Sequence, residues 1–279
     1  MRKSLLLVLM LILCACQPQV LVSTATPTQT LPKTTPTPAP TPTQVVTLTA
    51  LPKPSPTPLP VFKICSPLED ETIQTLPQIV TNPLDIPRYF GQDTGHHGVD
   101  FGYFQRGDRQ SIEGIEIYSI LNGKTVLTLD DDIPYGYAIM IETPLSDLPE
   151  AVQQVLLTGY LPVPEDPNYR LSCPEVPVPT LTGEYAVYHL YAHMQARSEL
   201  NRGDPIACGD QLGTVGNTGY SSNPHLHLET RLGPAGATFK TMAHYENTIT
   251  LEQIENYCLW RMSGYYQLFD PFILFEAAH

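Results

Sequence analysis

Basic residues are scarce in the part of this chain that can fold. The chain has 15 lysine and arginine residues against 28 aspartate and glutamate residues. All 28 acidic residues but only 11 basic ones lie in residues 61–279, so this part has a formal net charge of −17. Nucleic-acid-binding proteins need a basic face, and anionic lipid headgroups attract basic clusters. The deficit argues against a nucleic-acid-binding domain and against a lipid-binding domain surface.

The apolar run near the N-terminus is too short to cross a membrane. Two basic residues precede an apolar run at residues 5–13. Nine residues of helix span only about 14 Å, and a bilayer core is about 30 Å thick. A charged start with a short apolar run is typical of a secretory signal. The LCAC sequence at residues 13–16 resembles the bacterial lipobox, which predicts removal of residues 1–15 and a lipid on Cys16; cleavage near Ala15 with incidental cysteines is the alternative.

Acidic residues are absent from residues 17–60. Twelve of these 44 residues are proline and twelve are threonine. Such a composition cannot bury enough apolar surface to fold, and proline favours extended polyproline II. We therefore expect residues 16–61 to be a disordered tether with a reach on the order of 100 Å. A passive spacer or a glycosylated stalk is compatible with the same composition.

Pairs of the C-x-x-C type are also absent, so a structural zinc–thiolate site is not expected. The folded part keeps four cysteines, Cys65, Cys173, Cys208 and Cys258. In an oxidising exterior an even number suggests two disulfides, and four cysteines allow three pairings. We favour Cys65–Cys258, which would join the start of the domain to a late helix, and Cys173–Cys208, which would attach an insertion to the core.

Short β-branched or aromatic runs recur along the folded part, bounded by Gly, Asn, Asp and Pro. They lie at residues 99–103, 114–120, 124–129, 137–141, 185–191, 205–208 and 225–230. Their hairpin spacing predicts an all-β fold with an antiparallel, two-layer sheet. Residues 62–279 are long enough for one large domain.

Two helices are expected in this domain. Asp147, with a proline and an acid after it, has the pattern of a cap and capping box before a helix at 151–157. Thr250 opens a second helix that ends near residue 258. The proline-rich residues 144–183 interrupt two strand signals, so we interpret them as a largely irregular insertion that contains the first helix.

Six of the eight histidines fall into three small groups. In Asn223-Pro224-His225-Leu226-His227-Leu228-Glu229, the two histidines share one face of a strand, and their Cα atoms are about 6.6 Å apart. The alternating leucines place the opposite face in the core. One histidine can therefore bind a metal while the other addresses a water molecule. A pair of ordinary surface or core imidazoles would show the same spacing.

The segment Gly95-His96-His97-Gly98-Val99-Asp100 is the second group. His96 and Asp100 would be about 13 Å apart in a straight strand, too far for one metal. A bend at Gly95 and Gly98 brings them together. His96, Asp100 and His227 would then form a three-ligand set with an open position, as in catalytic zinc sites. A glycine-rich turn without a metal is the alternative.

These motifs, with Tyr191-Ala192-His193-Met194 and the glycine-rich run at residues 213–219, resemble the lysostaphin-type (LytM-like) zinc endopeptidases. The resemblance covers roughly residues 88–143 and 185–231. It implies an antiparallel sheet with a groove over one Zn²⁺, held by His96, Asp100 and His227. It further implies catalytic roles for His193 and His225, which would activate the water and stabilise the tetrahedral intermediate.

The resemblance assigns no role to two other histidines. His97 lies at a variable position of the motif. His189 shares strand parity with His193, so it either lines the edge of the groove or is a half-buried strand residue. The insertion at 144–183 follows a strand beside the groove and is in a position to wall or cover it.

The implied function is zinc-dependent hydrolysis of peptide bonds in the stems or cross-links of bacterial peptidoglycan. The alternative is a lipoprotein that binds peptidoglycan or regulates a hydrolase without cutting, although relatives of that kind usually lack some ligands. We expect an extracytoplasmic monomer that is attached to the cell envelope only through the lipid on Cys16. The sequence favours no particular peptide bond or cross-link.

Overall fold

The computed structural model describes residues 62–163, 173–174, 176 and 178–277. The expected signal peptide at 1–15, the lipid site at Cys16 and the tether at 16–61 lie outside the described residues. Within the described residues, no helix combines the length and the apolar character needed to cross a membrane. These residues form a mostly antiparallel β-structure with few helices, as predicted.

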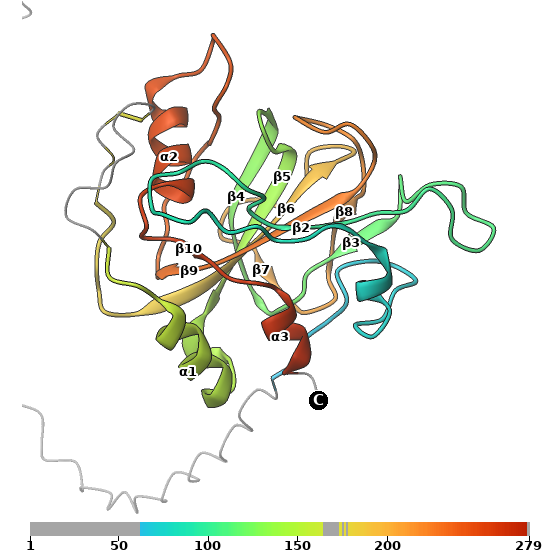
Figure 1. The fold of residues 1–279 in the computed structure, drawn as a ribbon, viewed down its shortest axis with the longest axis horizontal. Helices are drawn as coiled ribbons and strands as arrows, with labels where there is room; N and C mark the ends of the chain where they lie inside the picture. The colour runs from blue at the N-terminus through green and yellow to red at the C-terminus, as the bar shows by residue number, and fades with distance from the viewer. Residues whose placement is uncertain (1–61, 164–172, 175, 177, 278–279) are drawn as a thin grey trace, which may run out of the picture. The chain divides into compact units, whose positions relative to one another are not determined.

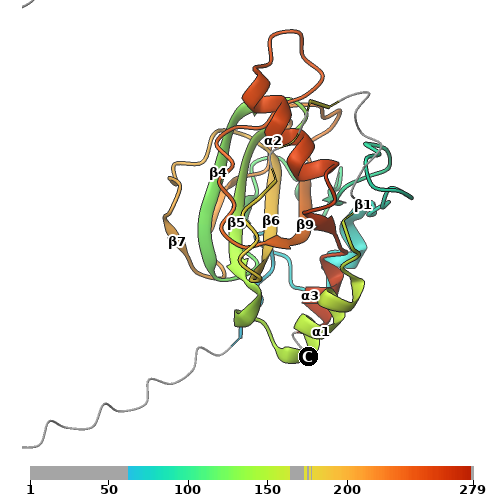
Figure 2. The ribbon, with the colours of Figure 1, turned by 90° about the vertical axis from the view of Figure 1, so that its left-hand side faces the viewer.

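An eight-stranded antiparallel sheet forms the centre of the domain. Its order is β1-β2-β9-β6-β5-β4-β7, and β10 also pairs with β9. Figure 2 shows most of these strands side by side, with α2 in front of them. The strands are β1 (Val80–Asn82), β2 (Val99–Phe101), β4 (Gly123–Asp132), β5 (Gly136–Pro144), β6 (Tyr185–Met194), β7 (Pro205–Ile206), β9 (Leu226–Pro234) and β10 (Gln267–Leu268).

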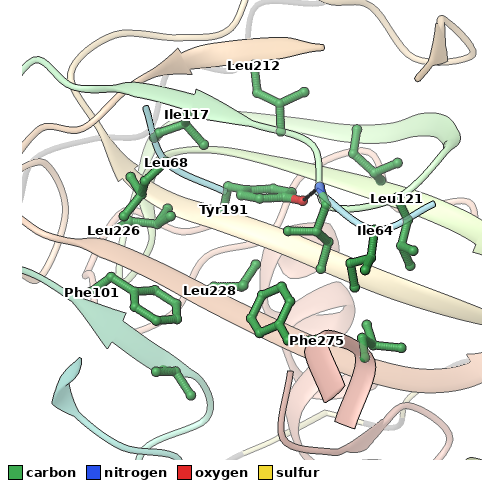
Figure 3. Close-up of a cluster of buried hydrophobic side chains, with 14 of the residues drawn as sticks. Ile64, Leu68, Phe101, Ile117, Leu121, Tyr191, Leu212, Leu226, Leu228 and Phe275 are labelled. Atoms are coloured by element: carbon green, nitrogen blue, oxygen red, sulfur yellow. Dashed lines mark hydrogen bonds between the residues drawn. The ribbon is translucent and has the colours of Figure 1, made fainter. Parts of the chain in front are cut away.

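One face of the sheet is covered by a second, two-stranded sheet and by short helices. β3 (Glu116–Tyr118) pairs with β8 (Gln211–Thr214), and η1 (Leu76–Ile79) and α3 (Phe272–Glu276) complete this layer. Strand alternation sends Phe101, Leu226 and Leu228 to this face, where they are buried. Figure 3 shows them in one cluster with Tyr191, whose hydroxyl accepts a 2.8 Å hydrogen bond from the backbone N–H of Ile120.

The opposite face is covered by α2 (Leu251–Arg261), which lies on the other side of the central strands from β3 (Figure 1). Thr250 and Gln253 form a reciprocal capping box, so the predicted start of this helix is confirmed. The helix continues three residues beyond the predicted end. Tyr257 and Trp260 are fully buried against side chains of β6, which makes this face a second apolar layer.

The insertion joins two neighbouring strands, since β5 ends at Pro144 and β6 begins at Tyr185. It contains η2 (Leu145–Asp147) and α1 (Glu150–Gly159). The predicted capping box at Asp147 is wrong. Asp147 belongs to η2, Pro149 occupies the N-cap, and no side chain caps the helix. Residues 164–172 of the insertion lie outside the described part.

The two disulfides are Cys65–Cys208 and Cys173–Cys258. The predicted pairs Cys65–Cys258 and Cys173–Cys208 are both wrong. Cys258 is buried in the layer between the sheet and α2. The backbone of Cys65 binds that of Ile120, which belongs to the core on the opposite face. The sheet therefore separates the cysteines that we had paired.

Removing the Cys173–Cys258 bond by a double substitution to serine is expected to destabilise the domain. The bond closes a separation of 85 residues, and such links typically contribute about 2–4 kcal/mol to the free energy of unfolding. Urea unfolding of both proteins under non-reducing conditions measures the difference. Tryptic mapping without reduction is the companion measurement, and a Cys65–Cys258 peptide would overturn the observed connectivity.

Candidate functional site

Three neighbouring strands bring the candidate residues together. Asp100 of β2 lies directly opposite His227 of β9, and His227 lies opposite Ala192 of β6. Leu226 and Leu228, on either side of His227, point into the core on the other face. Because side chains alternate along a strand, this register places Asp100 and His227 on the face that α2 covers in part.

The loop before β2 is bent, as predicted, and this bend carries His96 back to Asp100. Gly95 has a φ of +81°, in the left-handed region that favours glycine. A Cβ atom at Gly98 would lie 2.7 Å from the ring of His227. Glycine at this second position therefore allows β9 to approach the loop closely. Both glycines are needed for the geometry of the site.

Three side-chain atoms converge at this bend. Nε2 of His96 lies 3.0 Å from Oδ1 of Asp100 and 3.2 Å from Nδ1 of His227, and the last two atoms are 2.9 Å apart. Among the described residues, this is the one group of three that could hold a metal ion. Tetrahedral zinc with bonds of 2.0–2.1 Å requires about 3.3 Å between ligand atoms. The residues fit zinc after separating by a few tenths of an ångström.

The far nitrogen of each ring faces an oxygen atom. Nδ1 of His96 donates to the carbonyl of Pro83 at 2.8 Å, which leaves Nε2 for the site. Nε2 of His227 is buried without a hydrogen bond among the described residues, and Oε2 of Glu229 faces it at 3.6 Å. A carbonyl or carboxylate behind the ring is the usual means of orienting a metal-binding histidine.

The charges at this cluster are strongly coupled. Burial raises the pKa of Asp100, but hydrogen bonds from His227 and His96 outweigh burial and hold this pKa well below its usual range. Burial lowers the pKa of His227, but Asp100 and Glu229 outweigh it and raise this pKa to about 9. Its two carboxylate neighbours thus favour the protonated ring of His227. Because a metal binds only the neutral ring, metal binding at this cluster would release a proton.

A bulge in β6 turns His193 toward the same space. Between two paired positions, β6 advances from Tyr191 to Met194 while β5 advances by only two residues. His193 itself has a φ of +60°. Its ring centroid lies 4.7 Å from that of His225 and 5.8 Å from that of His227. The structure therefore brings together all five residues that the sequence selected.

His189 does not face the candidate site. Its shared parity with His193 holds only in a regular strand, and the bulge reverses the facing of His193. His189 is fully buried on the opposite face, where its ring binds the hydroxyls of Thr143 and Tyr191 at 3.0 and 2.8 Å. It is a core residue, more deeply buried than the half-buried position that we had considered.

His193 and His225 are oriented in the same way. Nδ1 of His193 donates to the carbonyl of Thr218 at 2.8 Å, and Nδ1 of His225 donates to the carbonyl of Asn223 at 2.7 Å. In both rings Nε2 is therefore turned toward the site, and Nε2 of His225 lies 3.5 Å from Oδ1 of Asp100. Burial, followed by the neighbouring His227 and His225, lowers the pKa of His193 to about 3. His193 is neutral at pH 7 and can accept a proton at Nε2.

Sequence reasoning missed a buried network behind His227. Glu229 accepts a 2.7 Å hydrogen bond from the hydroxyl of Tyr135 and forms an ion pair with Arg231. Arg231 also donates to Nδ1 of His97 at 2.8 Å. Glu229 and Arg231 share strand parity with His227. This parity was the sequence signal that could have placed both side chains on the face of the site. His97, to which the motif gave no role, thus supports the network that contacts the site.

Residues 180–258 match the family model "Peptidase family M23". This segment contains His193, His225 and His227 and extends into α2, whereas His96 and Asp100 precede it. The resemblance to lysostaphin-type peptidases is confirmed by this match. No curated protein sequence matches the chain.

Several solved structures resemble the chain at low identity. A zinc-containing peptidase from Vibrio cholerae is 19% identical over 54% of this chain and 32% of its own, with a TM-score of 0.30. Csd3 from Helicobacter pylori is 18% identical, over 62% and 32%, with a TM-score of 0.31. The lysostaphin catalytic domain from Staphylococcus simulans is 17% identical, over 74% and 99%, with a TM-score of 0.33. The match covers about a third of the length of the first two of these proteins.

Replacing Glu229 by glutamine is expected to weaken zinc binding by about 10–100-fold, because the ring of His227 loses the carboxylate that orients it. Competition with a chromogenic chelator measures the affinity. Glu142→Gln is the matched control, since Glu142 is another buried carboxylate of the sheet but binds Gly236 and Lys124. Equal affinities in Glu229→Gln and the unmodified protein would contradict this role.

Proposed function

We propose that this chain, with its match to peptidase family M23 at residues 180–258, is a zinc-dependent endopeptidase that hydrolyses peptide bonds in bacterial peptidoglycan. The observation that carries the proposal is the convergence of His96, Asp100 and His227 within 2.9–3.2 Å. The rings of two further histidines, His193 and His225, face the same space. A binding protein would have no need for this second pair.

His96, Asp100 and His227 would hold the zinc through Nε2, Oδ1 and Nδ1. When bound, zinc acts as a Lewis acid on the scissile carbonyl and lowers the pKa of water toward about 7. The depressed pKa of Asp100 keeps the carboxylate charged over the whole neutral range. Glu229, behind His227, would keep that ring aligned.

His193 and His225 would carry the proton transfers. The neutral His193 would accept a proton at Nε2 from the attacking water, since its Nδ1–H is held by Thr218. Nε2 of His225 lies 3.5 Å from Oδ1 of Asp100, beside the cluster. In its protonated form, His225 would stabilise the developing oxyanion or protonate the leaving amine.

The same proposal gives the chain its organisation and place in the cell. Residues 1–15 would be a signal peptide, Cys16 would carry lipid, and 16–61 would tether the catalytic residues 62–279 to the cell envelope. The segment at about 144–183 would be an insertion within this catalytic domain. A lipid anchor and a long tether suit an enzyme that acts on the wall layer near its membrane.

Digestion of purified peptidoglycan, followed by mass analysis, tests the activity. We expect new amine and carboxyl ends within the peptide stems or cross-links, and loss of the products after treatment with a chelator. Zinc content of residues 62–279 is measured in parallel and is expected to be about one ion per chain. Intact wall with bound protein would instead support the non-catalytic alternative.

Substitution by alanine is expected to separate metal binding from proton transfer. His96→Ala, Asp100→Ala and His227→Ala should each sharply reduce zinc content. His193→Ala and His225→Ala should keep the zinc but lose at least about a hundredfold in rate, because acid–base groups typically contribute 10²–10⁴-fold. Metal analysis and wall-digestion rates check both sets.

His189→Gln is the matched control for His193→Ala. Both residues lie on β6, but His189 faces the core. The activity of the His189→Gln variant, per folded molecule, is expected to equal that of the unmodified protein. If His225→Ala loses zinc while His227→Ala retains it, the two histidines have exchanged roles. Full activity in both His193→Ala and His225→Ala would refute their assignment.

A further inference from the structure

A pocket of about 440 Å³ has no part in the roles proposed above. It is lined by Pro134, Tyr220, Tyr245, Tyr257 and Arg261. The guanidinium carbon of its wall residue Arg261 lies 5.9 Å from the ring centroid of Tyr135, which lies 6.2 Å from that of His227. Tyr245 precedes α2, and Tyr257 and Arg261 belong to it. The segment after β9 therefore contributes most of the wall, and no acidic side chain is among the described residues that line this pocket.

The loop that contains Thr218 and Tyr220 forms one border of this pocket. The carbonyl of Thr218 accepts the hydrogen bond from the ring of His193. Two residues later, the backbone N–H of Tyr220 donates to the carbonyl of Pro134 at 2.8 Å. Pro134 and Tyr220 thus connect the pocket to the segment that positions a catalytic ring.

The loop that carries His96 forms the other border. Asp93 lies three residues before His96, and its Oδ1 accepts a 2.7 Å hydrogen bond from Nε of Arg261. Its Oδ2 accepts from the hydroxyls of Tyr245 and Tyr257. Both oxygens of Asp93 are therefore engaged behind the pocket wall. Both borders of the pocket therefore belong to segments that carry or hold residues of the candidate site.

Arg261 is the charged group of the pocket wall. Besides the bond from Nε to Asp93, Nη1 donates to the hydroxyl of Tyr135 at 3.3 Å. The guanidinium lies 5.4 Å from the ring centroid of Tyr257, in a cation–π contact. Among the described residues, Nη2 has no hydrogen-bond partner, and the side chain keeps 12% of its exposure. One edge of the guanidinium is thus available to a ligand.

We propose that this pocket binds a free carboxylate of the peptide substrate, close to the bond that is cut. The proposal rests on the proposed function and adds the chemical class of the substrate. Within the guanidinium fork, Nη2 is the nitrogen without a partner and can donate to a ligand carboxylate, and hydrogen bonds between charged groups are the strong ones. Arg261 is the one charged side chain among the described residues that line the pocket, and it supplies the donor that a carboxylate needs there.

Paired synthetic peptides test this inference. The two peptides mimic wall stems and differ only in whether their carboxylates are free or converted to primary amides. We expect the unmodified, zinc-loaded protein to cleave the free acid with a kcat/KM about 10–100-fold higher, which corresponds to one charged hydrogen bond. This comparison needs no variant, and equal kcat/KM values would overturn the proposal.

Variants then locate the effect. Arg261→Gln is expected to bring the ratio of the kcat/KM values for acid and amide close to one, and zinc content per folded chain is measured beside it because Asp93 loses its ion-pair partner. Arg261→Lys should keep part of the preference, because it retains the charge but not the fork. Arg88→Gln is the matched control, since Arg88 is exposed and lines a neighbouring pocket of about 400 Å³ that Arg261 also borders. An unchanged ratio in folded Arg261→Gln would refute the assignment to this pocket.

Failure of the proposed function has a different signature. In that case the protein cleaves neither peptide, and calorimetric titration of the unmodified protein with each peptide replaces the rates. Binding of the free acid at least tenfold tighter would support the carboxylate pocket without the peptidase activity. Equal dissociation constants would overturn it.

Discussion

The pairing of β9 with both β2 and β6 is the constraint on which the site depends. It sets Asp100 against His227 and places the end of β6 alongside. Because strand side chains alternate with a period of two, a slip of one residue would send His227 into the core and expose Leu228. The buried leucines on β9 thus fix the register, and the apolar face of the sheet determines the geometry of the polar one.

Buried charges on the polar face are stabilised in pairs. Glu229 is fully buried, and burial alone would raise its pKa; the adjacent Arg231 outweighs burial and keeps it ionised. Asp93 and Arg261 form a second pair at 2.7 Å. An unpaired buried charge costs several kcal/mol, so each pair depends on both partners. These pairs hold the loop before His96 and the strand that carries His227 in one arrangement, which a tight metal site requires.

Much of the fold and of the site was predictable because it is encoded locally. Strand runs bounded by turn residues appear where the structure has them, Thr250 and Gln253 form the predicted cap, and the H-x-H spacing alone places His225 beside His227. The disulfides were not predictable, since pairing depends on which face of the sheet each cysteine occupies. The facing of His189 relative to His193 was also hidden, because one extra residue in the bulge of β6 reverses strand parity without a sequence signal. The network of Glu229 and Arg231 needed knowledge of what covers the sheet.

The bond between Cys173 and Cys258 has a consequence for how such chains diverge. It ties the insertion, which joins β5 to β6, to a helix that follows β9. The two segments are remote in sequence, yet they lie against the same layer and share a covalent link. A relative that shortens the insertion and loses Cys173 would leave an unpaired thiol inside α2.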